Sequence, residues 1–168
     1  MPTSRRTPDG PTGALAEKAT GPVGRDDRSS WASSPAVRRT MQGNRSSDTA
    51  PELRLRSALH RSGLRFFKHR RPQGVSCRVD VLFPGLRLAV FVDGCFWHGC
   101  PTHGTRPRTN AMWWVSKLER NRARDERNDA ELRDAGWAVL RLWEHEPVER
   151  AVELVHAALA ARSGLVVA

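Results

Sequence analysis

Two short apolar runs close together in the chain most constrain what this sequence can fold into. Residues 78–83 (RVDVLF) and 88–92 (LAVFV) are separated only by PGLR, a sequence typical of a turn. The second run is almost wholly apolar, as expected of a central strand that is buried on both faces. Such a strand needs helices on both sides of its sheet, and we therefore predict a small α/β domain.

Helical patterns flank these runs. Apolar residues at helical spacing follow residue 52, and we expect Thr49 to cap this helix, Glu52 to bond back to the Thr49 amide, and Gly63 to end it. A long charged helix is predicted over residues 113–135, a third strand over 137–143 and an amphipathic helix over 148–161. Residues 66–69 are ambiguous and compatible with an extended segment. The predicted order is therefore α, β, β, α, β, α.

Charge narrows the class of partner. The chain carries 28 Lys and Arg against 18 Asp and Glu, a net charge of +10. This surplus favours a polyanion, and nucleic acid first, although a basic chain can also be merely soluble. No apolar run approaches the roughly 20 residues of a membrane span, the N-terminus has no apolar signal region, and three cysteines do not make a disulfide framework. We expect a cytoplasmic protein with no membrane partner.

The two ends of the chain differ from the predicted domain. Residues 1–30 are rich in Pro, Gly, Ser, Thr and charge, and we predict a disordered tail. Residues 31–46 are basic and contain Trp31, which either packs back onto the domain or belongs to an arm that contacts DNA. The folded domain is expected over residues 47–163, with a short tail over 164–168.

A loop rich in Cys and His follows the second apolar run. Cys95, Cys100 and His103 have four and two residues between them, and thiolate and imidazole are the ligands that tetrahedral zinc prefers. His145, at the end of the third predicted strand, is the expected fourth ligand if the strand ends meet at one edge. The alternative is buried cysteines beside surface histidines. Cys77 lies apart and is predicted to be a spare thiol.

Asp80 is the most informative single residue, because an unpaired carboxylate within an apolar strand is costly. One interpretation places it at an exposed strand edge. The other is a ligand for Mg²⁺, which usually takes one or two protein carboxylates and keeps several waters. The Val92 carbonyl on the neighbouring strand could assist. Glu52 could also contribute, but its role in the helix cap explains it equally well.

His98 lies inside the Cys/His loop, where it is either an alternative metal ligand or an imidazole free to activate water or stabilise a phosphate. Phe96 and Trp97 precede it. Two adjacent aromatic residues are more often part of the core, but on a rigid rim they could wedge between base pairs.

The long predicted helix presents three polar residues on one face, at spacings of four and three: Lys117, Asn121 and Arg124. Nearby acidic residues favour a solvated face. Contact with DNA phosphates is the second interpretation, and the net charge supports it.

Together these residues resemble the very-short-patch-repair (Vsr) DNA mismatch endonucleases over Met41 to Glu146. The matching pieces are Asp48 to Leu53, Val79-Asp80-Val81, the DGCFWHGC core at 93–100, Pro107-Arg108-Thr109, Trp114 with Lys117, Asn121, Arg124 and Asp125, Ala135-Gly136-Trp137, and Trp143-Glu144-His145. The Gly-Cys-Phe-Trp-His core is the most diagnostic of these.

The resemblance implies a restriction-endonuclease-like fold, with a central mixed sheet flanked by helices. It also implies nicking of one strand 5′ to the T of a T·G mismatch that arose by deamination of 5-methylcytosine. It assigns roles as follows: Mg²⁺ to Asp80 and the Val92 backbone, catalysis to His98 with support from Glu52, intercalation to Phe96, Trp97 and Met41, and structural Zn²⁺ to Cys95, Cys100, His103 and His145.

The chain departs from better-known members, which carry Thr-His where this chain has Val92-Asp93. Asp93 is therefore expected to act either as a second metal-binding carboxylate or as a proton acceptor, alongside Asp80 and His98. The metal-binding loop also differs from the usual pattern: Cys100 and His103 stand where His and Cys are usual, and His145 replaces a cysteine.

The sequence-based hypothesis is thus a Mg²⁺-dependent nickase with a structural zinc, expected to be a monomer in the nucleoid that acts before downstream repair proteins. Its substrate is double-stranded DNA with a T·G mismatch. Two rivals are a sequence- or structure-specific nuclease that ignores mismatches, and a zinc module that binds DNA without cutting it.

Overall fold

A computed structural model of the chain describes residue 39 and residues 47–105 and 107–164. The predicted tail over 1–30, nearly all of the arm over 31–46 and the proposed intercalating residue Met41 lie outside the described residues. The elements of the domain are α2 (Ala50–Arg61), β1 (Phe67–Arg70), β2 (Val79–Phe83), the short 3-10 helix η1 (Pro84–Leu86), β3 (Leu88–Asp93), α3 (Ala111–Asp134), β4 (Ala138–Trp143) and α4 (Val148–Ser163).

The four strands form one mixed sheet in the order β1-β2-β3-β4. The first two pairs are antiparallel, whereas β3 and β4 are parallel, with Val90 opposite Leu140. Helix α3 makes the crossover that a parallel pair requires. The predicted α/β class with a mixed sheet is confirmed, and the ambiguous stretch over residues 66–69 overlaps the edge strand β1.

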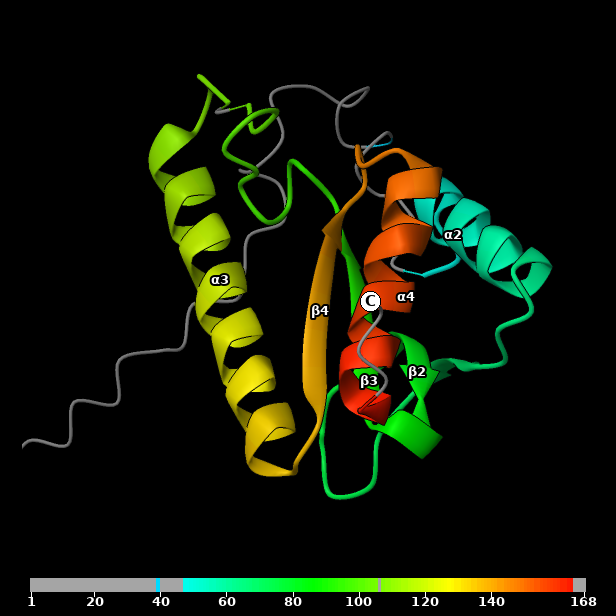
Figure 1. The fold of residues 1–168 in the computed structure, drawn as a ribbon. Helices are drawn as coiled ribbons and strands as arrows, with labels where there is room; N and C mark the ends of the chain where they lie inside the picture. The colour runs from blue at the N-terminus through cyan, green and yellow to red at the C-terminus, as the bar shows by residue number, and fades with distance from the viewer. Residues whose placement is uncertain (1–38, 40–46, 106, 165–168) are drawn as a thin grey trace, which may run out of the picture.

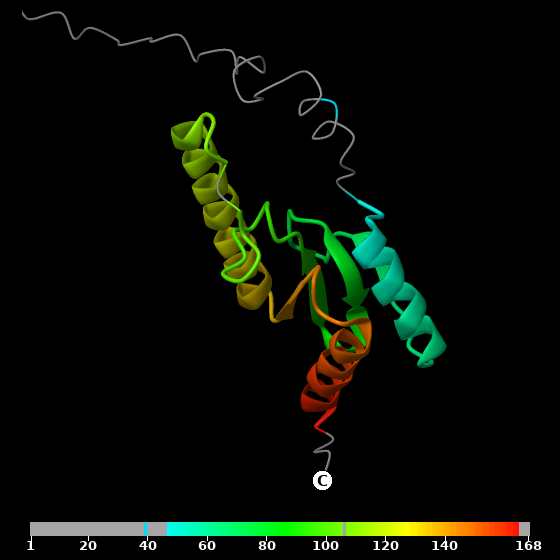
Figure 2. The same cartoon turned by 90° about the horizontal axis from the view of Figure 1, so that it is seen from above.

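Helices cover both faces of this sheet. Helices α2 and α4 lie on one face and α3 lies on the other (Figure 1), an arrangement that is also clear from above (Figure 2). Alternate residues of β3 serve the two layers: Leu88 and Val90 pack with α2 and α4, whereas Ala89 and Phe91 pack with Leu132 of α3. These β3 residues are buried, as predicted for a central strand.

The start of α2 differs from the predicted capping box. Thr49 is the N-cap residue, but its side chain makes no capping bond. The Glu52 carboxylate instead accepts from the Asp48 amide at 3.0 Å and from the Thr49 hydroxyl at 2.9 Å. The expected bond to the Thr49 amide was therefore wrong by one residue, because the carboxylate reaches past the cap toward a larger polar cluster.

Strand direction decides where the chemistry-bearing residues meet. Because β2 runs against β3 and β4, the start of β2 lies at the same edge of the sheet as the ends of β3 and β4. Asp80 is at that start, and Asp93 and Trp143 are the two ends. The loop over 94–104 continues from β3 at this edge, which is the upper edge of the sheet in Figure 1.

Candidate active site and metal centre

Asp80 is held where β2 and β3 separate. Its Oδ2 atom accepts a hydrogen bond from the Val92 amide at 2.9 Å. The pKa of Asp80 is raised to about 6, chiefly because burial penalises the charged form; the negative charges of Glu52 and Asp93 add to the rise, and the Val92 hydrogen bond and His69 oppose it. A carboxylate in such surroundings is stabilised by a cation. The Asp80 carboxylate and the Val92 carbonyl are oxygen donors of the kind that a hard divalent ion takes.

A second polar cluster lies between Asp80 and α2, built from Asp48, Glu52, Arg56 and His69. The Arg56 guanidinium forms ion pairs with Asp48 and, at 3.7 Å, with Glu52, and it donates to His69 Nε2 at 2.8 Å. His69 Nδ1 is 4.0 Å from Asp80 Oδ1. Although the ligand atoms of Asp48, Glu52 and His69 lie within 4.8 Å of one another, Arg56 already supplies the positive charge on this side.

Sequence reasoning did not single out Arg56 or His69. Both lie in segments with ordinary surface composition, and their roles depend on β1 running beside β2, with Lys68 opposite Val81. The burial of Arg56, which is only 5% exposed, follows from the acidic partners that surround it and not from any local pattern.

His98 is oriented by a carboxylate of α3. Its Nδ1 atom is 2.6 Å from Asp125 Oδ2 and 3.7 Å from Asp93 Oδ1. With a carboxylate oxygen as its acceptor, Nδ1 is the ring nitrogen that carries the hydrogen in this pair, and Nε2 is the ring nitrogen left to accept a proton. From the sequence, Asp125 is one of the residues that resemble the family and one of the acidic residues that favour a solvated face, but its contact with His98 was not predicted.

Asp93 lies between His98 and Arg141 and acts electrostatically on Asp80. It is buried, and both of its carboxylate oxygens accept from Arg141 Nη1, at 2.8 and 3.0 Å. Its charge also raises the pKa of Asp80, and its carboxylate lies beside His98. Asp80, Asp93 and His98 therefore converge at one edge of the sheet, as the sequence-based hypothesis requires.

The four predicted zinc ligands come together. One ligand atom from each of Cys95, Cys100, His103 and His145 lies within 4.8 Å of the others. His145 Nδ1 is 3.0 Å from Cys95 Sγ and 3.8 Å from Cys100 Sγ, and His103 Nδ1 is 4.0 Å from Cys100 Sγ. The ligand bond lengths of tetrahedral zinc imply edges of about 3.3–3.8 Å, so this donor set fits a closed four-coordinate site.

Burial raises the pKa of the Cys95 thiol to about 11, and the neighbouring Cys100 sulfur contributes. A bound metal would displace the thiol proton and remove the cost of a buried thiolate. The backbone also favours this loop: a Cβ atom on Gly104 would lie 2.4 Å from the Cys100 carbonyl oxygen, so a residue with a side chain does not fit there.

Two hydrogen bonds of Glu144, one from its side chain and one from its backbone, attach the Cys/His loop to the strand ends. Glu144 Oε1 accepts from the Cys95 amide at 2.6 Å, and the Glu144 amide donates to the Asp93 carbonyl at 2.9 Å. The loop and the proposed catalytic residue Asp93 therefore share one backbone frame.

Phe96 and Trp97 are half-buried and rest on α3. The Phe96 ring is 5.0 Å from the Trp114 ring and 5.1 Å from the Trp97 ring, measured between centroids, and Trp114 is buried. The pair lies on the loop that carries the metal ligands, but in this structure it packs against the domain. Intercalation by these rings stays a prediction.

The three predicted phosphate contacts lie in different surroundings. Asn121 is buried and donates to the Trp97 carbonyl at 3.0 Å, so its amide positions the loop. Lys117 is half-buried, and Arg124 is exposed and paired with Asp125 at 3.2 Å. Contact of these side chains with phosphate stays a prediction.

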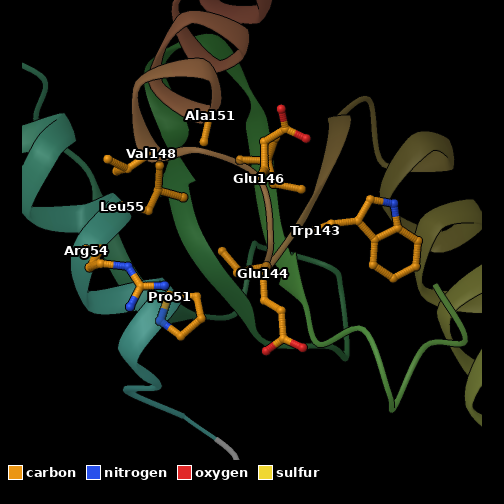
Figure 3. Close-up of a pocket in the computed structure, with 10 residues that line it drawn as sticks. Pro51, Arg54, Leu55, Trp143, Glu144, Glu146, Val148 and Ala151 are labelled. Atoms are coloured by element: carbon orange, nitrogen blue, oxygen red, sulfur yellow. The ribbon is translucent and has the colours of Figure 1, made fainter. Parts of the chain in front are cut away.

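A hollow opens between α2, α4 and the ends of β3 and β4 (Figure 3). Of the residues expected in the active site, only Val92 lines it, so the reacting centre is placed at the carboxylates and His98 instead. The lining residues are Pro51, Arg54, Leu55, Val92, Leu142, Trp143, Glu144, Glu146, Val148 and Ala151. No helix in the described part of the chain is long and apolar enough to cross a membrane.

The chain is similar in sequence to known DNA endonucleases. The family model for the DNA mismatch endonuclease Vsr matches residues 33–103. The type II nicking enzyme V.NaeI of Lentzea aerocolonigenes is 49% identical over 120 residues, which cover 70% of this chain and 72% of that protein. V.XorIIP of Xanthomonas oryzae pv. oryzae is 45% identical over 67% of this chain and 83% of its own length.

The DNA mismatch endonuclease Vsr of Escherichia coli is 38% identical over 100 residues, 58% of this chain and 62% of that enzyme. Among solved structures, the catalytic domain of the homing endonuclease I-Bth0305I aligns with a TM-score of 0.47 and 20% identity, over 68% of this chain and 98% of that domain. The family assignment rests on the sequence relatives, and on them this chain belongs to the Vsr family of DNA endonucleases.

Proposed function

We propose that this chain is a divalent-metal-dependent nickase that cuts one DNA strand 5′ to the T of a T·G mismatch. The observation that carries the proposal is the convergence of Asp80, Asp93 and the His98–Asp125 pair at one edge of the sheet. Membership of the Vsr family supports the mismatch substrate, since one relative is named a DNA mismatch endonuclease.

His98 is the proposed general base. Its Nδ1–H bond to Asp125 orients the ring and stabilises the imidazolium that forms when Nε2 accepts a proton from water. The water oxygen forms a bond to phosphorus, the bond from phosphorus to the leaving sugar oxygen breaks, and that oxygen takes a proton from solvent. Asp93 adds negative charge on the same side of the imidazolium.

Asp80 and the Val92 carbonyl are the groups that would hold a magnesium ion. When bound, this ion supplies electrostatic stabilisation of the phosphate and the leaving oxygen. Glu52 is a supporting residue in this scheme, because it lies behind His69 and adds to the negative potential at Asp80.

Zinc is the metal proposed for Cys95, Cys100, His103 and His145, in a structural role. It would fix the loop that carries His98 and hold Phe96 and Trp97 at a rim from which they could enter the base stack, with Met41 as a further candidate. The half-buried Lys117 and the exposed Arg124, both on α3, are the proposed phosphate contacts, and the buried Asn121 positions the loop beside them.

The experiment is a nicking assay on duplexes with identical flanks, one containing T·G and one containing C·G, with a different label on each strand. Randomised flanks cover an unknown recognition sequence. We expect one labelled strand of the T·G duplex to be cut when Mg²⁺ is present, and no cutting with EDTA. Asp80→Asn should lose at least about 10³-fold in rate and still bind the duplex, because the change removes a charge that acts on the reacting phosphate. Asp134→Asn, at the end of α3, is the matched control.

A nickase without mismatch preference is the second candidate, favoured by relatives named type II nicking enzymes. It predicts equal cutting of the T·G and C·G duplexes. A module that only binds DNA predicts that neither duplex is cut and that Asp80→Asn changes nothing. Either result would overturn the proposed mismatch nickase.

A further inference from the structure

Arg141 is a cation behind the proposed active site whose contacts extend from β3 to α3. It lies on β4 opposite Phe91, its guanidinium carbon is 4.6 Å from the centre of the Phe91 ring, and its side chain is 24% exposed. This placement directs the guanidinium into the layer between the sheet and α3, where an unpaired charge would be costly.

The partners of Arg141 are carboxylates from two elements. Its Nη1 atom donates to both oxygens of Asp93, at 2.8 and 3.0 Å. Its Nε atom donates to Asp129 Oδ2 at 3.3 Å and its Nη2 atom donates to Asp129 Oδ1 at 2.9 Å, which is the bidentate side-on geometry of a guanidinium and a carboxylate. Its Nη2 atom also lies 3.5 Å from the Asp125 carbonyl oxygen and 3.9 Å from Asp125 Oδ1.

Two of these three carboxylates are the ones that face His98. Asp125 holds Nδ1 at 2.6 Å and Asp93 lies 3.7 Å from the same atom. Arg141 therefore does not need to touch His98 to set its position. It fixes, from the far side, the acidic groups between which the imidazole sits.

We propose that Arg141 is a positioning residue that orients His98 through Asp93 and Asp125 and directs Asp93 away from the ion that Asp80 would hold. This inference rests on the proposed nicking activity for its kinetic part. The sequence left two roles open for Asp93, metal ligand or proton acceptor. The proposed role of Arg141 excludes the first. Asp93 then acts as an anchored charge beside the imidazolium.

Removing the guanidinium would leave Asp93, Asp125 and Asp129 facing one another. Arg124 and Arg133 pair with Asp125 and Asp129 from the solvent side, at 3.2 and 3.3 Å, but neither has a contact with Asp93 in the described structure. Asp93 would be left buried without its counter-charge, and rotation toward the cation at Asp80 would then be favoured.

The test uses the full chain with Arg141→Met, which keeps side-chain length and removes the charge, and Arg141→Lys, which keeps the charge and loses the fork. Arg133→Met is the matched control, because it also removes a guanidinium from Asp129 but leaves Asp93 untouched. If Arg141→Met does not fold, Asp129→Asn, which removes only the far-side partner, takes its place. Folding is checked by circular dichroism and thermal unfolding.

Kinetics are measured on whichever duplex the wild-type protein nicks. We expect Arg141→Met to lower kcat by about 10- to 100-fold, as for other losses of general-base orientation, with KM changed by less than threefold. Arg141→Lys should recover only part of the loss. The double variant Asp93→Asn/Arg141→Met should be more active than Arg141→Met alone, since it no longer contains an unpaired Asp93.

A second readout needs no activity. Nitrogen-15 NMR of the protein without magnesium reports the hydrogen-bonded Nδ1–H of His98, which we expect to be lost or broadened in Arg141→Met and retained in Arg133→Met. Titration with Mn²⁺ should show a higher affinity for this ion in Arg141→Met, because Asp93 is then free to rotate toward it. The double variant Asp93→Asn/Arg141→Met should restore the wild-type affinity.

A folded Arg141→Met variant with wild-type kcat and an unchanged His98 resonance would overturn the inference. If the wild-type chain nicks no duplex, the proposed function fails, and the NMR and Mn²⁺ measurements still decide the role of Arg141. An unchanged resonance together with an unchanged Mn²⁺ affinity would overturn it in that case as well.

Discussion

The two faces of the sheet are stabilised by different forces. On the face covered by α2 and α4, Leu59, Val90 and Val155 belong to one continuous cluster of fully buried apolar side chains. On the face covered by α3, the apolar cluster reaches Leu132, near the end of that helix, and the half toward the active-site edge is held by ion pairs and by the Cys/His loop.

This difference separates stability from chemistry. Apolar packing is insensitive to small electrostatic changes and gives the sheet a fixed frame. The ionic layer places charges of both signs within hydrogen-bond distance of the reacting edge, where they can orient His98 but contribute less net stability, because buried ion pairs must offset their desolvation. We therefore expect substitutions on the two faces to have different consequences.

The largest effect should follow loss of the zinc proposed for the Cys/His loop. Structural zinc contributes about 10–16 kcal/mol of binding free energy in small zinc domains, and the buried residues of the loop over 94–104 are Cys95 and Cys100, two of the proposed ligands. Cys100→Ala, or treatment of the wild-type protein with a strong chelator, should abolish nicking and lower the melting temperature. Metal content by mass spectrometry checks the cause, with Cys77→Ala as control. Full activity in a metal-free sample would show that packing alone holds this loop.

On the ionic face, His98→Ala should lower kcat by about 10²- to 10⁴-fold and leave the free energy of unfolding nearly unchanged, because general-base catalysis is lost without loss of core packing. Asp125→Asn should cause a smaller drop in the same direction. Single-turnover nicking and urea unfolding measure the two quantities. His156→Ala, at an exposed position of α4, is the control. A large loss of stability in His98→Ala would contradict the expectation that His98 serves catalysis and not stability.

On the apolar face the opposite result is expected. Leu59→Ala should lower the free energy of unfolding by about 2–5 kcal/mol, since it leaves a cavity in a fully buried cluster. Its kcat, measured well below the melting temperature, should match wild type. Leu53→Ala on the same helix, at a position that is 51% exposed, should cost far less. Equal costs at both positions would mean that this face is not the main source of stability.

The smallest effect is expected for Asp80→Asn, whose gain in stability over the wild type should depend on pH. Because the folded-state pKa of Asp80 is raised from 3.8 to about 6, the folded protein binds a proton more tightly than the unfolded chain, and ionised Asp80 is destabilising. The penalty is absent below about pH 4, grows as the pH rises and is complete above about pH 6. Asp80→Asn should therefore be more stable than wild type by roughly 1–3 kcal/mol at pH 8 without divalent metal, and equal to it near pH 3.5.

Added Mg²⁺ should narrow that difference by stabilising only the wild-type protein. Urea unfolding at the two pH values, with and without Mg²⁺, checks both statements. A stability difference that is the same at pH 3.5 and pH 8 would show that Asp80 does not carry a buried charge.

The sequence alone determined the parts of this protein that depend on local pattern. Apolar runs and turn residues predicted β2, β3, β4 and the helices, because burial on both faces and helical periodicity are written directly in residue order. The Cys and His spacing, together with His145 at a strand end, predicted the four-residue cluster that the structure brings within 4.8 Å. The motifs around residues 93–100 predicted the family, which the relatives confirm.

Only the tertiary structure decided which charges meet. Asp125 reaches His98 across 27 positions and Arg141 reaches Asp93 across 48, and Arg56 joins β1 through His69. Asp125 and Arg56 stand among other charged residues of a helix, so no local period marks them, and Arg141 stands out as a cation within an apolar strand, which does not identify its partner. Electrostatic partners are selected by distance in space, which depends on strand order and on which helix covers which face, and residue order alone carries neither.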